Sequence, residues 1–184
     1  MMKMAGIVGL AAALTVLVGP GALAASNPDP KVEVVKVEEK AIVDEAISPQ
    51  TYIADAQQKG TKISSKEQAS ILASSCRRWG TGVSAKNGFG QLIISYRLDI
   101  DYCYNGTNIT ARNGYYREVK ADWGWTFEGH ESGSSGGVGN PSWKPWTKGE
   151  FCYLRYGGCV RQKFATVWLR VYGNGSRGFG SDLA

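Results

Sequence analysis

The chain has 184 residues, a formal charge of +5 and four cysteines, and 43% of its residues are hydrophobic. This length allows one folded domain with additional segments, and the apolar content excludes a chain that is disordered throughout. The basic residues are scattered and form no block, so we expect no nucleic-acid partner and only a weak attraction to anionic surfaces.

The first 24 residues have the pattern of a secretory signal peptide. Lys3 precedes an apolar run over residues 5–18, and residues 22–24 have the small-residue pattern of a cleavage site. A membrane-spanning helix needs about 20 apolar residues, which is more than this run supplies. We therefore expect a secreted, extracellular protein that begins near Ala25 and has no stable membrane insertion after cleavage.

Residues 25–62 are predicted to be a flexible tail or pro-region. Between residues 26 and 75 the sequence has many charged residues and a single aromatic residue, Tyr52. Such a segment buries too little apolar surface to fold alone. Ser64 and Glu67 have the spacing of a capping box, which predicts a short helix over about 65–75. The folded domain is expected over residues 63–184.

Alternating apolar residues predict strands in the rest of the chain. A long strand is expected over 92–104, followed by a hairpin turn at Asn105-Gly106. Further strands are expected over 115–127, 151–156 and 161–172. Residues 129–149 are rich in Gly, Ser, Pro and Trp, which predicts one long loop. The expected fold is mainly β, a small antiparallel β-sandwich or partial barrel with a short N-terminal helix and a disordered tail.

The four cysteines are Cys76, Cys103, Cys152 and Cys159. Export favours two disulfides over metal or redox chemistry, and three pairings are possible. We favour Cys76–Cys103 with Cys152–Cys159, because each cysteine then pairs with its nearest neighbour in the sequence. The single histidine cannot complete a zinc site of the usual spacing, so we expect neither a metal nor a cofactor.

Two sequence patterns resemble catalytic motifs but lack the required context. Residues 133–137 match G-x-S-x-G inside a Gly/Ser tract, without the strand and helix that a nucleophile elbow needs. Residues 173–178 match G-x-G-x-x-G, but the chain ends before a helix could follow. His130 has no evident catalytic partner. We therefore assign no catalytic residue.

An alternative hypothesis is a small secreted glycan hydrolase that uses paired carboxylates. The candidates are Asp99, Asp101, Asp122 and Glu128. Asp99 and Asp101 lie about 7 Å apart on one strand face. Arg97 shares that face, so a salt-bridged surface is the simpler interpretation.

The leading hypothesis is a non-enzymatic binding module for an extracellular polysaccharide, cell wall or protein partner. Trp143, Lys144 and Trp146 lie in the expected loop, and planar indoles beside polar groups are suited to binding. The alternative for these residues is that both indoles cover an open end of the sandwich. A third functional class is a secreted inhibitor or toxin-like effector, and we expect a monomer.

The C-terminal part of the chain resembles small secreted, β-rich, cysteine-containing proteins of actinobacteria. The resemblance rests on residues 149–159 (GEFCYLRYGGC), on Val171-Tyr172-Gly173-Asn174-Gly175 and on Tyr102-Cys103-Tyr104. It covers roughly residues 76–180 and implies secretion, β structure and two disulfides. It implies no activity.

Overall fold

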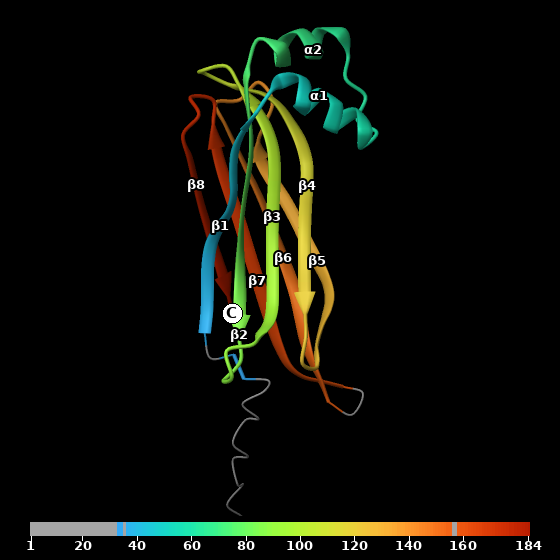
Figure 1. Cartoon of the computed structure of the whole chain (residues 1–184), viewed down its shortest axis with the longest axis vertical. Helices are drawn as coiled ribbons and strands as arrows, with labels where there is room; N and C mark the ends of the chain where they lie inside the picture. Colours follow the sequence, from blue (N-terminus) through green and yellow to red (C-terminus); the bar gives the residue numbers. More distant parts are fainter. Residues whose placement is uncertain (1–32, 35, 156–157) are drawn as a thin grey trace, which may run out of the picture.

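The computed structural model describes residues 33–34, 36–155 and 158–184. The expected signal peptide therefore lies outside the described residues. The described residues form eight strands and two helices, which follow one another along the chain as Figure 1 shows. Their bounds are β1 (Lys36–Ile47), α1 (Pro49–Gln58), α2 (Ser65–Leu72), β2 (Ser75–Lys86), β3 (Leu92–Tyr104), β4 (Ile109–Ala121), β5 (Trp125–Gly136), β6 (Ser142–Arg155), β7 (Gly158–Tyr172) and β8 (Arg177–Leu183).

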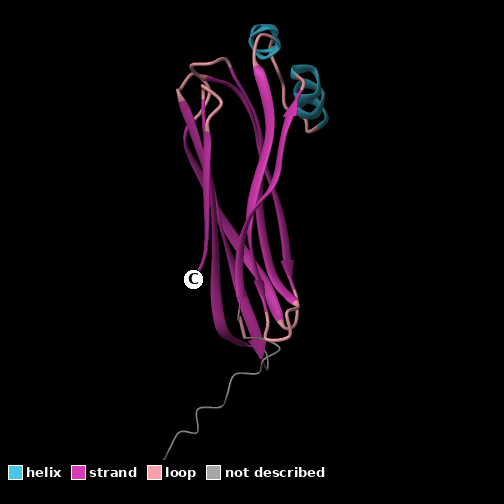
Figure 2. Cartoon of the chain, turned by 60° about the vertical axis from the view of Figure 1, so that its left-hand side comes forward, coloured by secondary structure: helices cyan, strands magenta, loops and turns pink. Residues whose placement is uncertain are grey.

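The strands form two antiparallel sheets of four strands each, in the orders β1-β2-β3-β4 and β5-β6-β7-β8. Figure 2 shows the two layers of strands, with both helices at one end. Neighbouring strands in each sheet are also neighbours along the chain. The predicted antiparallel β-sandwich is confirmed, and the sheets do not close into a barrel.

The main core lies between the sheets, because every second side chain of the central strands points inward. The largest fully buried side chains are Trp143, Tyr96, Tyr102, Phe151, Ile93, Ile94, Leu98, Ile100, Ile109, Leu169, Val83 and Val167. A smaller cluster lies where the helices cover the first sheet, and it includes Tyr52, Ile53, Ala56 and Ile71.

The predicted flexible tail over residues 25–62 is wrong for residues 36–58, which form β1 and α1. Strand β1 pairs with β2 from Lys36–Lys86 to Ile47–Cys76. A strand that is added to an existing sheet gains hydrogen bonds and packing that it lacks alone, so a polar segment can still be ordered. Helix α1 begins after Ser48, whose side chain accepts a hydrogen bond from the Thr51 N–H.

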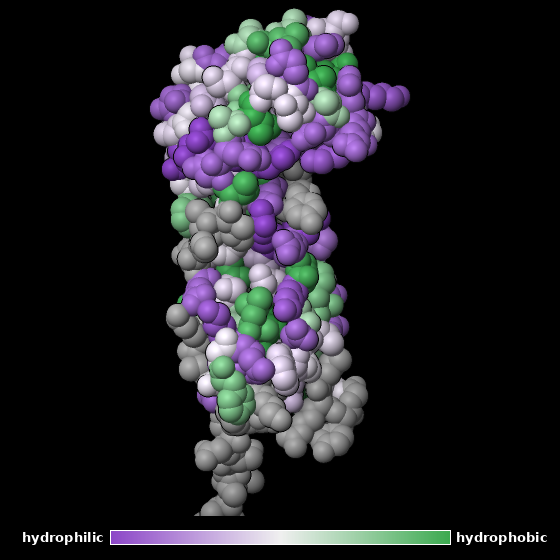
Figure 3. All heavy atoms as spheres, viewed as in Figure 1, coloured by the Kyte–Doolittle hydropathy of each residue, from purple (hydrophilic) through white to green (hydrophobic). Residues whose placement is uncertain are grey.

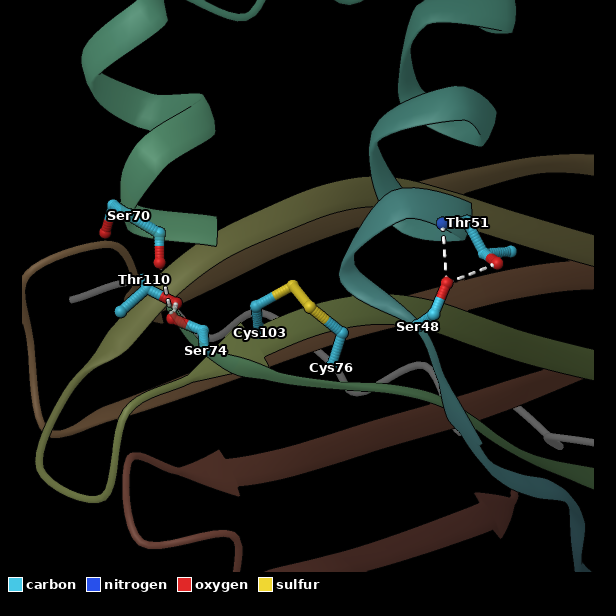
Figure 4. The surroundings of a disulfide bond; sticks show 7 residues. All are labelled: Ser48, Thr51, Ser70, Ser74, Cys76, Cys103 and Thr110. Carbon is cyan, nitrogen blue, oxygen red and sulfur yellow. Dashed lines mark hydrogen bonds between the residues drawn. A yellow bond between two sulfur atoms is a disulfide. The ribbon is translucent and has the colours of Figure 1, made fainter. Parts of the chain in front are cut away.

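The predicted short helix is confirmed as α2, with a complete capping box between Ser64 and Glu67. The predicted cysteine pairing is also confirmed, since disulfides join Cys76 to Cys103 and Cys152 to Cys159. Figure 4 shows the first disulfide below the two helices, where Cys76 and Cys103 lie directly opposite each other on β2 and β3. It therefore fastens the strand that follows α2 to the centre of the first sheet.

Two predicted elements between residues 115 and 149 are wrong. The expected strand over 115–127 is divided by a turn at Asp122-Trp123-Gly124, where Trp123 and Gly124 have positive φ angles. The expected loop over 129–149 is a hairpin of β5 and β6 that turns at residues 137–141. Pro145 lies within β6 opposite Ser134, although proline is rare inside a sheet.

Candidate binding surface

Trp143 and Trp146 lie on opposite faces of β6, because they are three residues apart in a strand. Trp143 points into the core and is 1% exposed. The expectation that Trp143 takes part in binding is therefore wrong, and its indole is a core side chain. Trp146 points away from the core and is half-buried.

Trp146 pairs directly with Trp168 of β7 on the outer face of the second sheet. Trp168 is also half-buried. The sequence placed Trp168 in a strand, but nothing in its local pattern identified it as a partner of Trp146. The register between β6 and β7 brings the two indoles together.

A glycine flanks each indole on the neighbouring outer strand. Trp146 pairs with Gly133 of β5, and Trp168 pairs with Gly180 of β8. A Cβ atom on Gly133 would lie 2.8 Å from Trp146 ring atoms, and one on Gly180 would lie 2.7 Å from Trp168 ring atoms. Each indole therefore covers the backbone of an outer strand. We name Gly133, Trp146, Trp168 and Gly180 the tryptophan row.

The tryptophan row crosses all four strands of the sheet. Since Gly133 and Gly180 are three strand spacings apart, the outer edges of the two indoles are separated by roughly 14 Å. The absence of side chains at both glycines leaves the rings as a wide, shallow aromatic surface. Such a surface can contact a flat ligand but encloses none.

Two basic residues lie on one side of the tryptophan row. Lys144 precedes Trp146 by two residues and Arg170 follows Trp168 by two, so all four side chains share the outer face. The Lys144 Nζ atom lies 4.9 Å from the centre of the Trp168 ring. This cation–π contact places the ammonium over part of the Trp168 ring face.

A pocket of about 150 Å³ lies on the other side of the row, where Glu131 and Lys148 pair across β5 and β6. Its lining residues are Gly129, His130, Glu131, Lys148, Glu150 and Phe164. The Lys148 Nζ atom lies 4.2 Å from the centre of the Phe164 ring. The Glu150 carboxylate accepts a hydrogen bond from the Gln162 amide.

The carboxylates of Asp99 and Asp101 lie on the outer face of the first sheet, each bound by an arginine. Arg97 contacts both Asp99 oxygens at 2.8 and 2.7 Å, and Arg78 contacts both Asp101 oxygens at 2.7 and 3.0 Å. Burial raises the pKa of Asp99, although Arg97 opposes this shift. Such bidentate contacts make a salt-bridged surface.

Arg78 also contacts Asp55 of α1 at 2.6 Å, so this ion pair fastens the helix to the sheet. Hydrophilic residues gather below the helices on this face (Figure 3). The remaining candidate carboxylates lie elsewhere, with Asp122 in the turn before β5 and Glu128 at an irregularity in β5. The structure does not bring the four candidate carboxylates together.

His130 and the two glycine-containing motifs have no catalytic arrangement in the structure. His130 stacks on Phe127, with ring centres 6.3 Å apart. Residues 133–137 end β5 and enter a turn, and residues 173–176 form the turn between β7 and β8. Within the described ranges, no three metal-binding side chains gather at one point.

No helix in the described part of the chain is both long and apolar enough to cross a membrane. Comparisons with protein-family models, with curated proteins and with solved structures find no match to this chain. The outer face of the second sheet is therefore interpreted from its own chemistry.

Proposed function

We propose that this chain is a secreted, non-enzymatic module that binds a carbohydrate polymer on the outer face of its second sheet. The observation that carries the proposal is the cross-strand pair of Trp146 and Trp168, each lying over a glycine. Two disulfides are consistent with an extracellular location, where thiols are oxidised.

A flat indole is complementary to a sugar ring. One face of a pyranose presents C–H groups that contact the aromatic face, while its hydroxyl groups stay hydrated at the edges. Because the outer edges of the two indoles span roughly 14 Å, a ligand that covers both rings fully is wider than a single sugar. This favours an oligosaccharide or a polymer.

The charged groups around the tryptophan row favour a glycan over an apolar protein surface. Lys144, Arg170, Glu131 and Lys148 flank the indoles. A protein hot spot is commonly set in a desolvated pocket and surrounded by contacts that exclude water. Here the indoles lie on a shallow surface with charged neighbours, which suits a hydrated ligand.

The proposal is tested by co-sedimentation of the full chain with insoluble polysaccharides, using chitin and purified peptidoglycan sacculi. Trp146→Ala and Trp168→Ala should each weaken binding by about 1–3 kcal/mol, the amount associated with an aromatic anchor. The fold of each variant is checked by thermal unfolding, since half-buried side chains also contribute to stability.

Trp123→Ala is the matched control, because Trp123 is 44% exposed but lies in the turn between β4 and β5. It should sediment as the wild type does. Unchanged binding by a folded Trp146→Ala/Trp168→Ala double variant would refute the proposal. Equal loss by the Trp123→Ala control would show that the effect is not specific to the tryptophan row.

A further inference from the structure

We infer that the bound polymer is a glycan whose substituents carry both carboxylates and amines, as in a peptide-substituted glycan. This inference rests on the proposed function and concerns the residues on either side of the tryptophan row. They form a basic side with Lys144 and Arg170, and an acidic side with Glu131 and Asp182.

The basic side follows from the register of the sheet. Lys144 pairs with Ser135, Arg170 pairs with Gly178, and both side chains point to the outer face two residues from an indole. Among the described residues, no ion pair joins either cation to a carboxylate. Two cations on one edge of an aromatic surface attract an anionic group on the ligand.

The acidic side lies two residues from the tryptophan row, in the direction along the strands opposite to the basic side. Glu131 pairs with Lys148, and Thr166 pairs with Asp182, so Glu131, Lys148, Thr166 and Asp182 follow one another across the sheet. Glu131 and Asp182 are exposed. The two carboxylates outnumber the Lys148 ammonium, so this row attracts a cationic group.

The acidic side includes the pocket that is lined by Glu131. Its volume of about 150 Å³ and its position beside the tryptophan row suit a small side group of a bound ligand. Glu131 and Glu150 supply two carboxylates to its lining, and Lys148 lies over Phe164. An ammonium group of a ligand held on the indoles can enter there.

Together these rows define the charge pattern of the ligand. The row spacing is about 7 Å along the strands, since two residues separate the indoles from each charged row. A glycan that lies along the tryptophan row would therefore place carboxylates towards Lys144 and Arg170, and amines towards Glu131 and Asp182. Neutral polymers such as cellulose and chitin lack both groups.

The inference is tested by co-sedimentation with purified peptidoglycan sacculi, chitin and cellulose. Three preparations of sacculi are compared: untreated, amidated at the carboxylates, and acetylated at the amines. Lys144→Gln/Arg170→Gln should weaken binding to untreated sacculi roughly five- to tenfold, as expected for two exposed charge contacts. It should have no such effect on amidated sacculi.

Glu131→Gln/Asp182→Asn should show the complementary pattern. Its binding should fall on untreated sacculi and stay at the wild-type value on acetylated sacculi. Lys62→Gln/Lys66→Gln is the control for net charge that matches Lys144→Gln/Arg170→Gln, because both lysines are exposed and lie outside the tryptophan row and its flanking residues. This control should bind as the wild type does.

The outcomes separate this inference from the proposed function. If the double tryptophan variant loses chitin binding but the wild type binds all three sacculus preparations and chitin equally, the charge pattern is refuted and the proposed function stands. If the double tryptophan variant binds every polymer as the wild type does, both are refuted. Equal losses in the Lys62→Gln/Lys66→Gln control would also refute the charge pattern.

Discussion

The Tyr96 hydroxyl on β3 lies 2.6 Å from Thr147 Oγ1 on β6, so a hydrogen bond crosses the interior of the sandwich. Thr147 Oγ1 itself donates to the Glu131 carbonyl oxygen at 3.1 Å. Tyr96 is therefore the donor in the first contact. This chain of hydrogen bonds connects the first sheet to the strands that carry the tryptophan row.

Removal of the Tyr96 hydroxyl should lower stability without changing the fold. Tyr96→Phe loses one buried hydrogen bond but leaves the Thr147–Glu131 contact intact, so we expect a loss of about 1 kcal/mol. Thr147→Val should cost more, because it leaves both the Tyr96 hydroxyl and the Glu131 carbonyl without this partner. Urea unfolding measures both values, and equal stability of Tyr96→Phe and wild type would contradict this account.

Gly133 should be coupled to Trp146. An alanine at this position places a methyl group where the indole now lies, so Gly133→Ala should displace the ring and weaken polymer binding. In a Trp146→Ala background the same substitution meets no indole. The difference between the two effects on unfolding free energy should be about 1 kcal/mol, as for other contacting pairs. Additive effects in this double-mutant cycle would show that the ring moves away freely.

Trp123 should be replaceable by a residue that stabilises the protein. Its φ angle is 56°, and the following Gly124 has φ 85°, so the pair forms a turn that favours Asn-Gly. Trp123→Asn should raise the unfolding free energy by roughly 0.5–1 kcal/mol, because asparagine tolerates the left-handed conformation better. A thermal melt detects this change. A lower melting temperature would mean that the Trp123 ring contacts matter more than its backbone strain.

Asp44 should make a pH-dependent contribution to stability. Burial raises its pKa, but hydrogen bonds and charges from Arg77 and Arg177 outweigh this effect, so the pKa is lowered in the folded state. The contribution is therefore complete above the unfolded pKa of about 4 and is lost as pH falls through the lower folded value.

Asp44→Asn should cost less than about 1 kcal/mol at neutral pH, since the Asp44 side chain is partly exposed. The cost should disappear in acid. Unfolding free energies of wild type and variant, measured in urea at neutral pH and at about pH 2, give the difference directly. A difference that does not change with pH would contradict the assigned ion pairs.

Much of the fold could be predicted because its signals are local. The Ser64–Glu67 capping box and the alternation along β3 are evident in the sequence, and the favoured one of three possible cysteine pairings is the one that the structure contains. The regular structure of residues 36–58 could not be predicted. It depends on the pairing of β1 with β2 and on the burial of Tyr52 and Ile53 of α1 against the first sheet.

The candidate surface was only partly predictable. Lys144 and Trp146 were selected for the right residue types, but the surrounding Gly, Ser and Pro residues predicted a loop where the chain forms a hairpin. In a strand, Trp143 and Trp146 lie on opposite faces, so only Trp146 belongs to the candidate surface and Trp143 is buried in the core. Trp168 and the two glycines belong to other strands of the sheet, and only the register between these strands places them in one row with Trp146.

The strands of each sheet are consecutive in the sequence, which bears on how this protein folds. Strands β1–β4 and β5–β8 come from two contiguous halves of the sequence, and each disulfide lies within one half. Each sheet can therefore assemble and oxidise through hairpin contacts of short sequence separation, which form faster than distant pairings. A chain that is delivered N-terminus first can complete its first sheet before the second is available. Cleavage at the turn around Trp123 would give two fragments that share no strand ladder. Their association would depend on burial between the sheets and on contacts such as the Tyr96–Thr147 hydrogen bond.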